Sequence, residues 1–383
     1  RAPIRYIRLM SAGKPYLLAS VTNHLGVTTT LGYTPSTSFY LADRRAGTPW
    51  ATRLPFPVQC LSTVTVENSV TGLVTVTTYA YHHGFFDGTE REFRGFGKVE
   101  QWDAQRYPLG ETTTNLPPIR TVTWFHTGAW EAEAKLLATY ATEFFAGDPD
   151  AFAPERSAFD VDIAVPGGGT MLREAHRALK GKPLRVEVYA EDGLTPTSSY
   201  PYVVTTSAWG VTTLQARSGD TPGIFLPYPT ETLTFHYERN PADPRIEQQL
   251  TLAVDALGVV TRSATLNYPR RTPSSGTLDG EQTRGSCRIT RTEVLHDTTS
   301  TDQWHIGLPF RARTWQLQPE ALDGTSTFYA DKVTTTDINP LVDLPEITGA
   351  GTATTPILAW DDPDLSDGPF LRKLSDQVTT YED

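Results

Sequence analysis

Histidines and carboxylates gather in the segment Tyr79–Asp103, and these residue types can bind metals or transfer protons. His82 and His83 are adjacent, and the nearby carboxylates are Asp87, Glu90 and Glu92. Neighbouring residues on a strand point to opposite faces, so both histidines reach one metal ion only if a β-bulge forms at Gly84. We therefore expect a structural role for these charges, which stabilise a sheet when they pair across strands. A metal-dependent hydrolase stays open as an alternative.

Two other segments have part of a ligand-binding pattern. Gly167–Gly169 precedes a predicted helix, as in phosphate-binding loops, but it lacks the lysine and the spacing, so we expect a flexible loop. Asp361–Asp367 is similar to a calcium loop, but Lys373 stands where a bidentate glutamate is needed. We expect a solvated acidic loop there and leave weak calcium binding open. No sequence pattern indicates a cofactor.

Aromatic residues offer a different chemistry, because a row of exposed tryptophans can stack on sugar rings. The candidates are Trp124, Trp130, Trp209 and Trp315. Aromatic side chains in β proteins more often fill the core, so we expect packing roles. A carbohydrate-binding or carbohydrate-active β protein is the alternative function that these residues support.

The histidine segment is predicted to form one long hairpin that turns at Asp87-Gly88, a dipeptide that accepts positive φ. On the returning strand, strict alternation places Phe93 with Gly95 and Gly97 on one face, and Phe96 on the other. A strand glycine often marks the close approach of a ring or another backbone. We therefore expect substitution of Gly95 by valine to clash. The motif residues to which we assign a structural role are Tyr81, Phe85, Asp87, Gly88, Glu90, Arg91, Phe93, Arg94, Gly95, Phe96 and Gly97.

The composition favours a mainly β protein. The 383 residues include 29 Gly and 29 Pro, and many Thr, Val and Tyr residues that fit pleated strands. The formal net charge of -11 argues against nucleic acid as a partner, and no apolar run approaches the ~20 residues that span a bilayer. Only Cys60 and Cys287 are present, and we expect two buried thiols rather than a disulfide.

Hairpins recur along the chain, interrupted by two predicted helices. Segments 16–33 and 254–268 share a polar residue, two further positions, a glycine and a Thr-rich strand that ends in Tyr. Apolar residues at helical spacing predict helices within 129–147 and 170–181. Further strands are predicted at 184–189, 202–206, 230–239, 248–255, 259–268, 326–336 and 357–360. Repeated hairpins bury their apolar faces by stacking, so we expect an elongated, curved antiparallel sheet with a small helical insertion near 129–181.

The run from Tyr81 to Asp103 (YHHGFFDGTEREFRGFGKVEQWD) resembles the signature of the B subunit of Tc (toxin complex) insecticidal toxins. These proteins are related to rearrangement-hotspot (YD-repeat) cocoon proteins. Further segments that resemble this family are Thr34–Tyr40, Trp50–Pro57, Trp124–Gly128, Arg177–Gly181, Glu187–Gly193 and Tyr237–Arg245. They cover most of residues 10–320, in the regions called middle/N-terminal and middle/C-terminal.

The resemblance implies a non-catalytic segment of a β-sheet shell that encloses a cytotoxic polypeptide and helps deliver it. The implied partners are other regions of the same polypeptide, a C subunit and a channel-forming A subunit, in a secreted complex without direct membrane insertion. We divide the chain into a β region 1–128, a helical insertion or linker 129–182, a β region 183–330 and a loop-rich segment 331–383. We expect the last segment to continue into a longer protein.

Overall fold

In the residues that the structure describes, the fold is built on one seventeen-stranded sheet. The computed structural model describes residues 14–109, 112–153, 158–159, 169–271, 277–299, 304–317, 332–342, 357–358 and 371–379. The strands are β1 Ser20–Thr22, β2 Val27–Pro35, β3 Gln59–Asn68, β4 Val74–Asp87, β5 Glu92–Leu109, β6 Thr112–Asn115, β7 Ile119–Phe125, β8 Ala158–Phe159, β9 Pro183–Ala190, β10 Val203–Gln215, β11 Ile224–His236, β12 Arg245–Val254, β13 Val260–Asn267, β14 Ser286–Asp297, β15 His305–Leu317, β16 Ile357–Leu358 and β17 Leu371–Val378.

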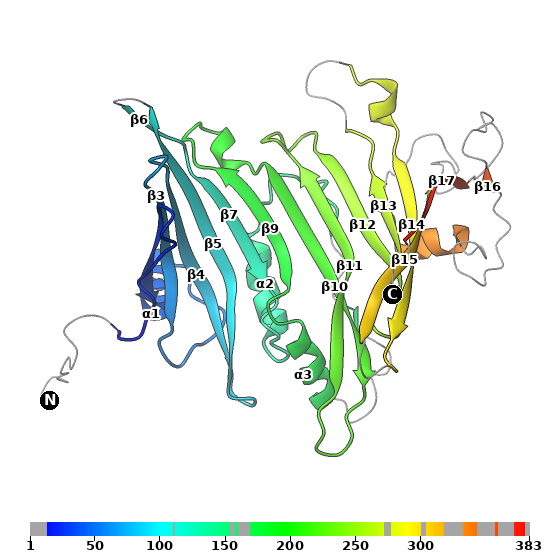
Figure 1. The fold of residues 1–383 in the computed structure, drawn as a ribbon, viewed down its shortest axis with the longest axis horizontal. Coiled ribbons are helices and arrows are strands. Elements are labelled where there is room, and N and C mark those ends of the chain that lie inside the picture. Colours follow the sequence, from blue (N-terminus) through cyan, green and yellow to red (C-terminus); the bar gives the residue numbers. More distant parts are fainter. Residues whose placement is uncertain are drawn as a thin grey trace, which may run out of the picture.

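Successive strands pair with their sequence neighbours across almost the whole sheet. The antiparallel order is β1-β2-β3-β4-β5-β7-β9-β10-β11-β12-β13-β14-β15-β17. β6 pairs with the last residues of β5, beyond the stretch that pairs with β7. β8 and β16 pair in parallel with β10 and β17. Figure 1 shows this sheet as a broad, twisted surface with the strands side by side. The expected mainly β, curved antiparallel sheet is confirmed.

The helices are short and lie along the sheet. They are α1 Ser36–Ala46, α2 Glu133–Glu143, α3 Gly169–Ala178 and α5 Thr335–Ile338, with 3-10 turns η2 Thr197–Ser199, η3 Gly280–Thr283 and η4 Asn339–Leu341. The expected helical insertion is confirmed by α2 and α3, which run beside the middle strands in Figure 1. Leu136 and Tyr140 of α2 pack against Val122 and Trp124 of β7. Leu179, just after α3, packs against Val211 of β10.

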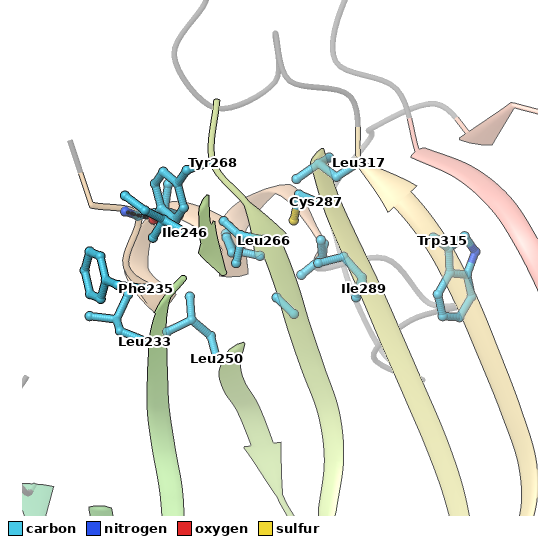
Figure 2. Packing of buried hydrophobic residues seen from close by; sticks show 14 of the residues in the cluster. Leu233, Phe235, Ile246, Leu250, Leu266, Tyr268, Cys287, Ile289, Trp315 and Leu317 are labelled. Carbon is cyan, nitrogen blue, oxygen red and sulfur yellow. Dashed lines mark hydrogen bonds between the residues drawn. The ribbon is translucent and has the colours of Figure 1, made fainter. Parts of the chain in front are cut away.

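The largest core lies on one face of the strands from β10 to β17. Residues that face each other across the ladders continue this core from strand to strand, as in the series Leu266, Cys287, Leu317 and Leu371. Figure 2 shows Leu266, Cys287 and Leu317 of this series on the same side of neighbouring strands. Ile338 and its neighbours in the segment 332–342 complete the cluster. This segment near the end of the sequence therefore covers strands that precede it by many residues.

Buried polar groups of the sheet hold these covering segments. Glu231 of β11 is 1% exposed, accepts a 2.6 Å hydrogen bond from Gln248 of β12 and pairs with Lys332 at 2.8 Å. Gln248 also donates to the carbonyl of Val333 at 2.9 Å. Because an unpaired buried charge is costly, these contacts fix where the segment 332–342 lies on the sheet.

The two segments with related sequences form the same turn. Asn23 Oδ1 accepts hydrogen bonds from the backbone N–H groups of Leu25 and Val27, and Asp255 Oδ1 accepts from those of Leu257 and Val259. The glycine of each turn, Gly26 or Gly258, has positive φ, at 96° and 77°. The shared pattern of a polar residue followed by Gly therefore has a direct conformational cause.

The later strand predictions hold only in part. Predicted strands at 184–189, 202–206, 230–239, 248–255 and 259–268 correspond to β9 through β13. The predicted strand 326–336 is wrong where it is described, because residues 335 and 336 begin α5. Thr334 caps that helix in a reciprocal capping box with Asp337, which outweighs the strand preference of a Thr-rich run. β16 forms within the predicted strand 357–360.

Candidate functional site

The hairpin β4–β5 is paired from Val74 opposite Arg106 to Asp87 opposite Glu92. Its turn comprises residues 88–91, so the predicted two-residue turn at Asp87-Gly88 is wrong. The positive φ of 53° falls on Arg91 rather than on Gly88. Asp87 organises the turn, because its Oδ1 accepts backbone hydrogen bonds from Thr89 at 2.9 Å and Glu90 at 3.0 Å. A side chain that replaces backbone partners in this way stabilises a longer turn.

A β-bulge interrupts the returning strand. Phe86 pairs with Phe93 while Phe85 pairs with Gly95, which leaves Arg94 as the extra residue. The predicted strict alternation is therefore wrong beyond this point, because a bulge shifts the side-chain sequence by one. Phe93 and Phe96 lie in edge contact with ring centroids 5.5 Å apart instead of on opposite faces.

The rings around this bulge form one aromatic cluster. Phe96 contacts Tyr81 at 4.9 Å and Trp50 at 6.0 Å between ring centroids. Phe56 contacts Phe86 at 5.3 Å, and the Tyr81 hydroxyl donates to the carbonyl of Leu61 at 2.8 Å. Such edge contacts add to the hydrophobic effect and bind the loop 47–58 to the hairpin. Phe85 packs instead with the cluster below α2.

The two strand glycines have different reasons to be glycine. A Cβ at Gly95 would meet nothing within 4 Å, so the predicted clash is wrong, but the φ of 95° is strained for other residues. A Cβ at Gly97 would overlap the hydroxyl of Tyr140 and lie 3.2 Å from the Cβ of His83. The close approach that the sequence suggested therefore occurs at Gly97.

Arg94 is the buried charge of the motif, with a side chain that is 0% exposed. Its Nη2 donates to Asp87 Oδ2 at 3.0 Å, and its Nε lies 3.0 Å from Glu92 Oε2. The second contact is an ion pair whose geometry is poor for a hydrogen bond. Lys180 and Arg177, near the end of α3, also pair with Glu92, so the turn is joined to the helical insertion.

The two histidines bind different carboxylates and do not meet at one site. His82 Nδ1 lies 2.7 Å from Asp43 of α1, whereas His83 Nε2 lies 3.0 Å from Glu143 of α2. His83 has a φ of 54°, and its Nδ1 accepts a 3.0 Å hydrogen bond from the N–H of Ala51. Nε2 therefore carries the proton that His83 donates to Glu143. The pair links the hairpin to two helices.

Glu143 remains charged in this half-buried place. Burial alone would raise its pKa, but hydrogen bonds from His83 and Trp124 and the charge of Lys98 outweigh it and lower the pKa to about 2. The Nε1 of Trp124 donates to Glu143 Oε2 at 2.9 Å. Glu143 is the last residue of α2, and its contacts with His83, Lys98 and Trp124 link this helix to β4, β5 and β7.

A second pair of histidines escaped the sequence reasoning. His126 and His176 are 6% and 5% exposed, and they line a small cavity between β7, α2 and α3 with Glu133 and Tyr140. Burial lowers the pKa of His176 to about 4, and burial together with the neighbouring His176 lowers the pKa of His126 to about 4. The sequence signal for His126 was its place within Trp124–Gly128, one of the segments that resemble the toxin family.

Other candidate chemistry finds little support in the geometry. The structure, where it is described, gathers no group of three or more His, Cys, Asp or Glu residues suited to a metal ion. Trp124 and Trp315 are each 1% exposed, which confirms their expected core role. Both cysteines are buried free thiols, and burial raises the pKa of Cys60 to about 11. The acidic run 361–367 and residues 167–168 lie outside the described residues. Across the helices that are described, none has the length and apolar character to cross a membrane.

Comparison with known proteins gives two family matches. Residues 6–128 match the family described as "Insecticide toxin TcdB middle/N-terminal region", and residues 174–308 match "Insecticide toxin TcdB middle/C-terminal region". No curated protein sequence matches the chain.

Solved toxin structures contain the same fold. The crystal structure of TcdB2-TccC3 is 27% identical, covers 93% of this chain and 18% of its own, and has a TM-score of 0.71. The Photorhabdus luminescens Tc holotoxin pore is 28% identical over 96% of this chain and 17% of its own, with a TM-score of 0.73. This chain therefore spans less than a fifth of the length of those toxin chains. Together, the two family matches and the shared fold show that the chain belongs to the Tc toxin B subunits and forms their middle/N-terminal and middle/C-terminal regions.

Proposed function

We propose that this chain is a non-catalytic wall segment of a Tc toxin shell, which encloses a cytotoxic polypeptide and helps deliver it. The observation that carries the proposal is the match over 97% of the chain, at a TM-score of 0.72, to the structure of TcdB2-TccC3-TEV. Because the match extends over both β regions and the helices between them, it supports the proposal that this chain occupies the same place in a shell of the same kind.

The architecture suits a wall. The sheet carries its largest core on one face, where α2 and the segment 332–342 cover it, and α3 packs against Val211 of β10. The opposite face is rich in hydroxyl groups, as in the cross-strand series Ser263, Thr290 and Thr314. A broad sheet that is sealed on one side and polar on the other separates two spaces with few layers.

The hairpin motif has a structural role in this proposal. Residues of the hairpin β4–β5 pair with one another and, through His82, His83 and Glu92, with α1, α2 and α3, so the hairpin holds the helical insertion against the first β region. Asp87 and Arg94 fix the turn, and Gly97 admits Tyr140. The same proposal includes the division of the chain into four parts. These are the β region 1–128, the helical insertion or linker 129–182, the β region 183–330 and the loop-rich segment 331–383.

The proposed partners follow from the solved relatives, which are named as TcdB2-TccC3 complexes and a holotoxin pore. We place a C subunit, other regions of the B subunit and a channel-forming A subunit beside this chain, in an extracellular toxin complex. Neither nucleic acid nor direct membrane insertion is part of the proposal. The acidic net charge of -11 supports the first exclusion.

Protection of the enclosed polypeptide tests the wall function. The B subunit that contains this chain is coexpressed with a C subunit, and the complex is treated with protease. We expect Gly97→Val, which forces Tyr140 out of place, to expose the enclosed polypeptide to cleavage. Gly88→Ala is the matched control, because a Cβ there meets nothing within 4 Å. Undiminished protection after deletion of residues 14–379 would contradict the proposal.

A further inference from the structure

Arginines from three neighbouring strands stand in a row on the sheet. Arg262 of β13 lies directly opposite Arg291 of β14, and Arg291 lies directly opposite Arg313 of β15. Arg311, two residues before Arg313, lies opposite Glu293. Adjacent strands are about 4.8 Å apart, so the row brings several positive charges within about 10 Å.

The row continues the face that carries the large core. Arg291 follows the buried Ile289 by two positions, and Arg313 precedes the buried Trp315 by two, so all four share one face. The guanidinium of Arg313 lies 5.9 Å from the ring centre of Trp315. The apolar core shown in Figure 2 thus gives way to positive charge further along the same strands.

Such a row costs stability unless anions compensate it, because like charges directly opposite each other repel. Within the described part of the chain, Glu293 is the carboxylate inside the row, and one of its oxygens contacts both Arg313 and Arg291, the latter at 3.3 Å. Burial lowers the pKa of Arg291, and the charges of Arg313, Arg262 and Arg311 lower it further. On β17, Asp376 lies opposite Arg313 and accepts two hydrogen bonds from Arg311, at 2.8 Å and 2.7 Å.

The row is open to a partner at one end. The side chains of Arg313, Arg291 and Arg311 are 13%, 20% and 36% exposed, so accessibility increases away from the core. Two apolar side chains flank the accessible end: Leu295, two positions after Glu293, is 51% exposed, and Val378, opposite Arg311, is 66% exposed. Positive charge beside exposed apolar groups fits a polypeptide better than a bare inorganic anion.

We propose that this arginine row binds an acidic segment of a partner polypeptide, with Asp or Glu carboxylates paired to Arg291, Arg311 and Arg313 and apolar residues of the segment against Leu295 and Val378. Each guanidinium has five N–H donors, so arginines that pair with Glu293 or Asp376 keep further donors that a carboxylate of the partner can accept from. The inference goes beyond the shell function and does not depend on it, because binding is measured on the chain alone.

The test uses fluorescence anisotropy with the 383-residue chain and a labelled peptide in which Glu alternates with Leu and Ala. We expect Arg291→Gln to weaken binding about tenfold, as loss of a charge that a ligand pairs with does. Arg245→Gln is the matched control, because Arg245 is a more exposed arginine on the opposite face of β12, paired with Glu238. Thermal unfolding of each variant accompanies the binding data, and we expect Arg291→Gln to unfold no lower than the wild type, since it relieves repulsion.

Four results would overturn the proposal. These are no binding by the wild type, equal weakening by the two variants, equal binding of a peptide with Gln in place of Glu, and displacement of the peptide by millimolar phosphate as readily as by unlabelled peptide. A lower unfolding temperature of Arg291→Gln with unchanged peptide binding would likewise show that the row serves only the fold.

Discussion

Mild acid should destabilise this protein through its two buried histidines. His126 and His176 have pKa values of about 4 in the folded state, lowered by burial from the ordinary 6.5. Because the folded pKa is depressed, the unfolded chain binds more protons between these two values. The stability contributed by the neutral imidazoles is therefore complete above the ordinary pKa and falls as the pH decreases toward about 4.

The magnitude follows from the linkage between proton binding and unfolding. For a folded pKa of about 4, acidification from about pH 7 to about pH 5 lowers the free energy of unfolding by about 2 kcal/mol per histidine, or about 4 kcal/mol for the pair. Glu133 lies 3.5 Å from His176 and favours its charged form, which makes this an upper value. Carboxylates such as Glu143, whose pKa is about 2, lose their contribution only at lower pH.

Urea unfolding at several pH values measures the effect. We expect His126→Gln to remove roughly half of the loss between about pH 7 and about pH 5, since it deletes one of two titrating groups. His305→Gln is the matched control, because His305 is exposed on β15, and its profile should follow the wild type. A wild-type free energy of unfolding that stays constant over this range, or identical slopes for wild type and His126→Gln, would refute the reasoning.

Two substitutions in the hairpin motif give further predictions. Gly97→Val should lower the free energy of unfolding by about 3 kcal/mol through overlap with Tyr140, and Gly95→Val by about 1 kcal/mol through backbone strain alone. Chemical denaturation ranks the two, and the reverse order would show that the overlap is relieved freely. Asp87→Ala should cost about 3 kcal/mol, because it removes a partner of the fully buried Arg94 side chain. Recovery of most of this loss in the double variant with Arg94→Met would identify the buried charge as the cause, whereas additive losses would contradict it.

Side-chain periodicity predicted the strands well where burial alone decides the pattern. In β12, buried and less buried residues alternate from Ile246 to Leu250, and the predicted strand 248–255 covers β12 except its first three residues. The helices α2 and α3 followed from apolar spacing in the same way. These elements obey local rules, since their burial pattern repeats with the period of the element.

The predictions failed where a single residue adopts an unusual backbone conformation. Positive φ at His83, Arg91 and Gly95 turns a regular hairpin into one with a longer turn and a bulge. Only Gly95 is a residue that favours such a conformation, and non-glycine residues with positive φ carry little sequence signal. The Gly97 contact with Tyr140 was missed for another reason, because it joins a strand to a helix about forty residues later.

Contacts over long sequence distances also decide how the core on the sheet is covered. Gln248 bonds to Val333, 85 positions later, and Glu231 pairs with Lys332, 101 positions later. Until the segment 332–342 is in place, Glu231 and Gln248 lack these partners on a sheet face that also exposes the core. Non-local contacts form slowly because the intervening chain must first be ordered. The strands from β10 to β15 can therefore pair early, but their buried face closes only when the late segment docks onto its polar anchors.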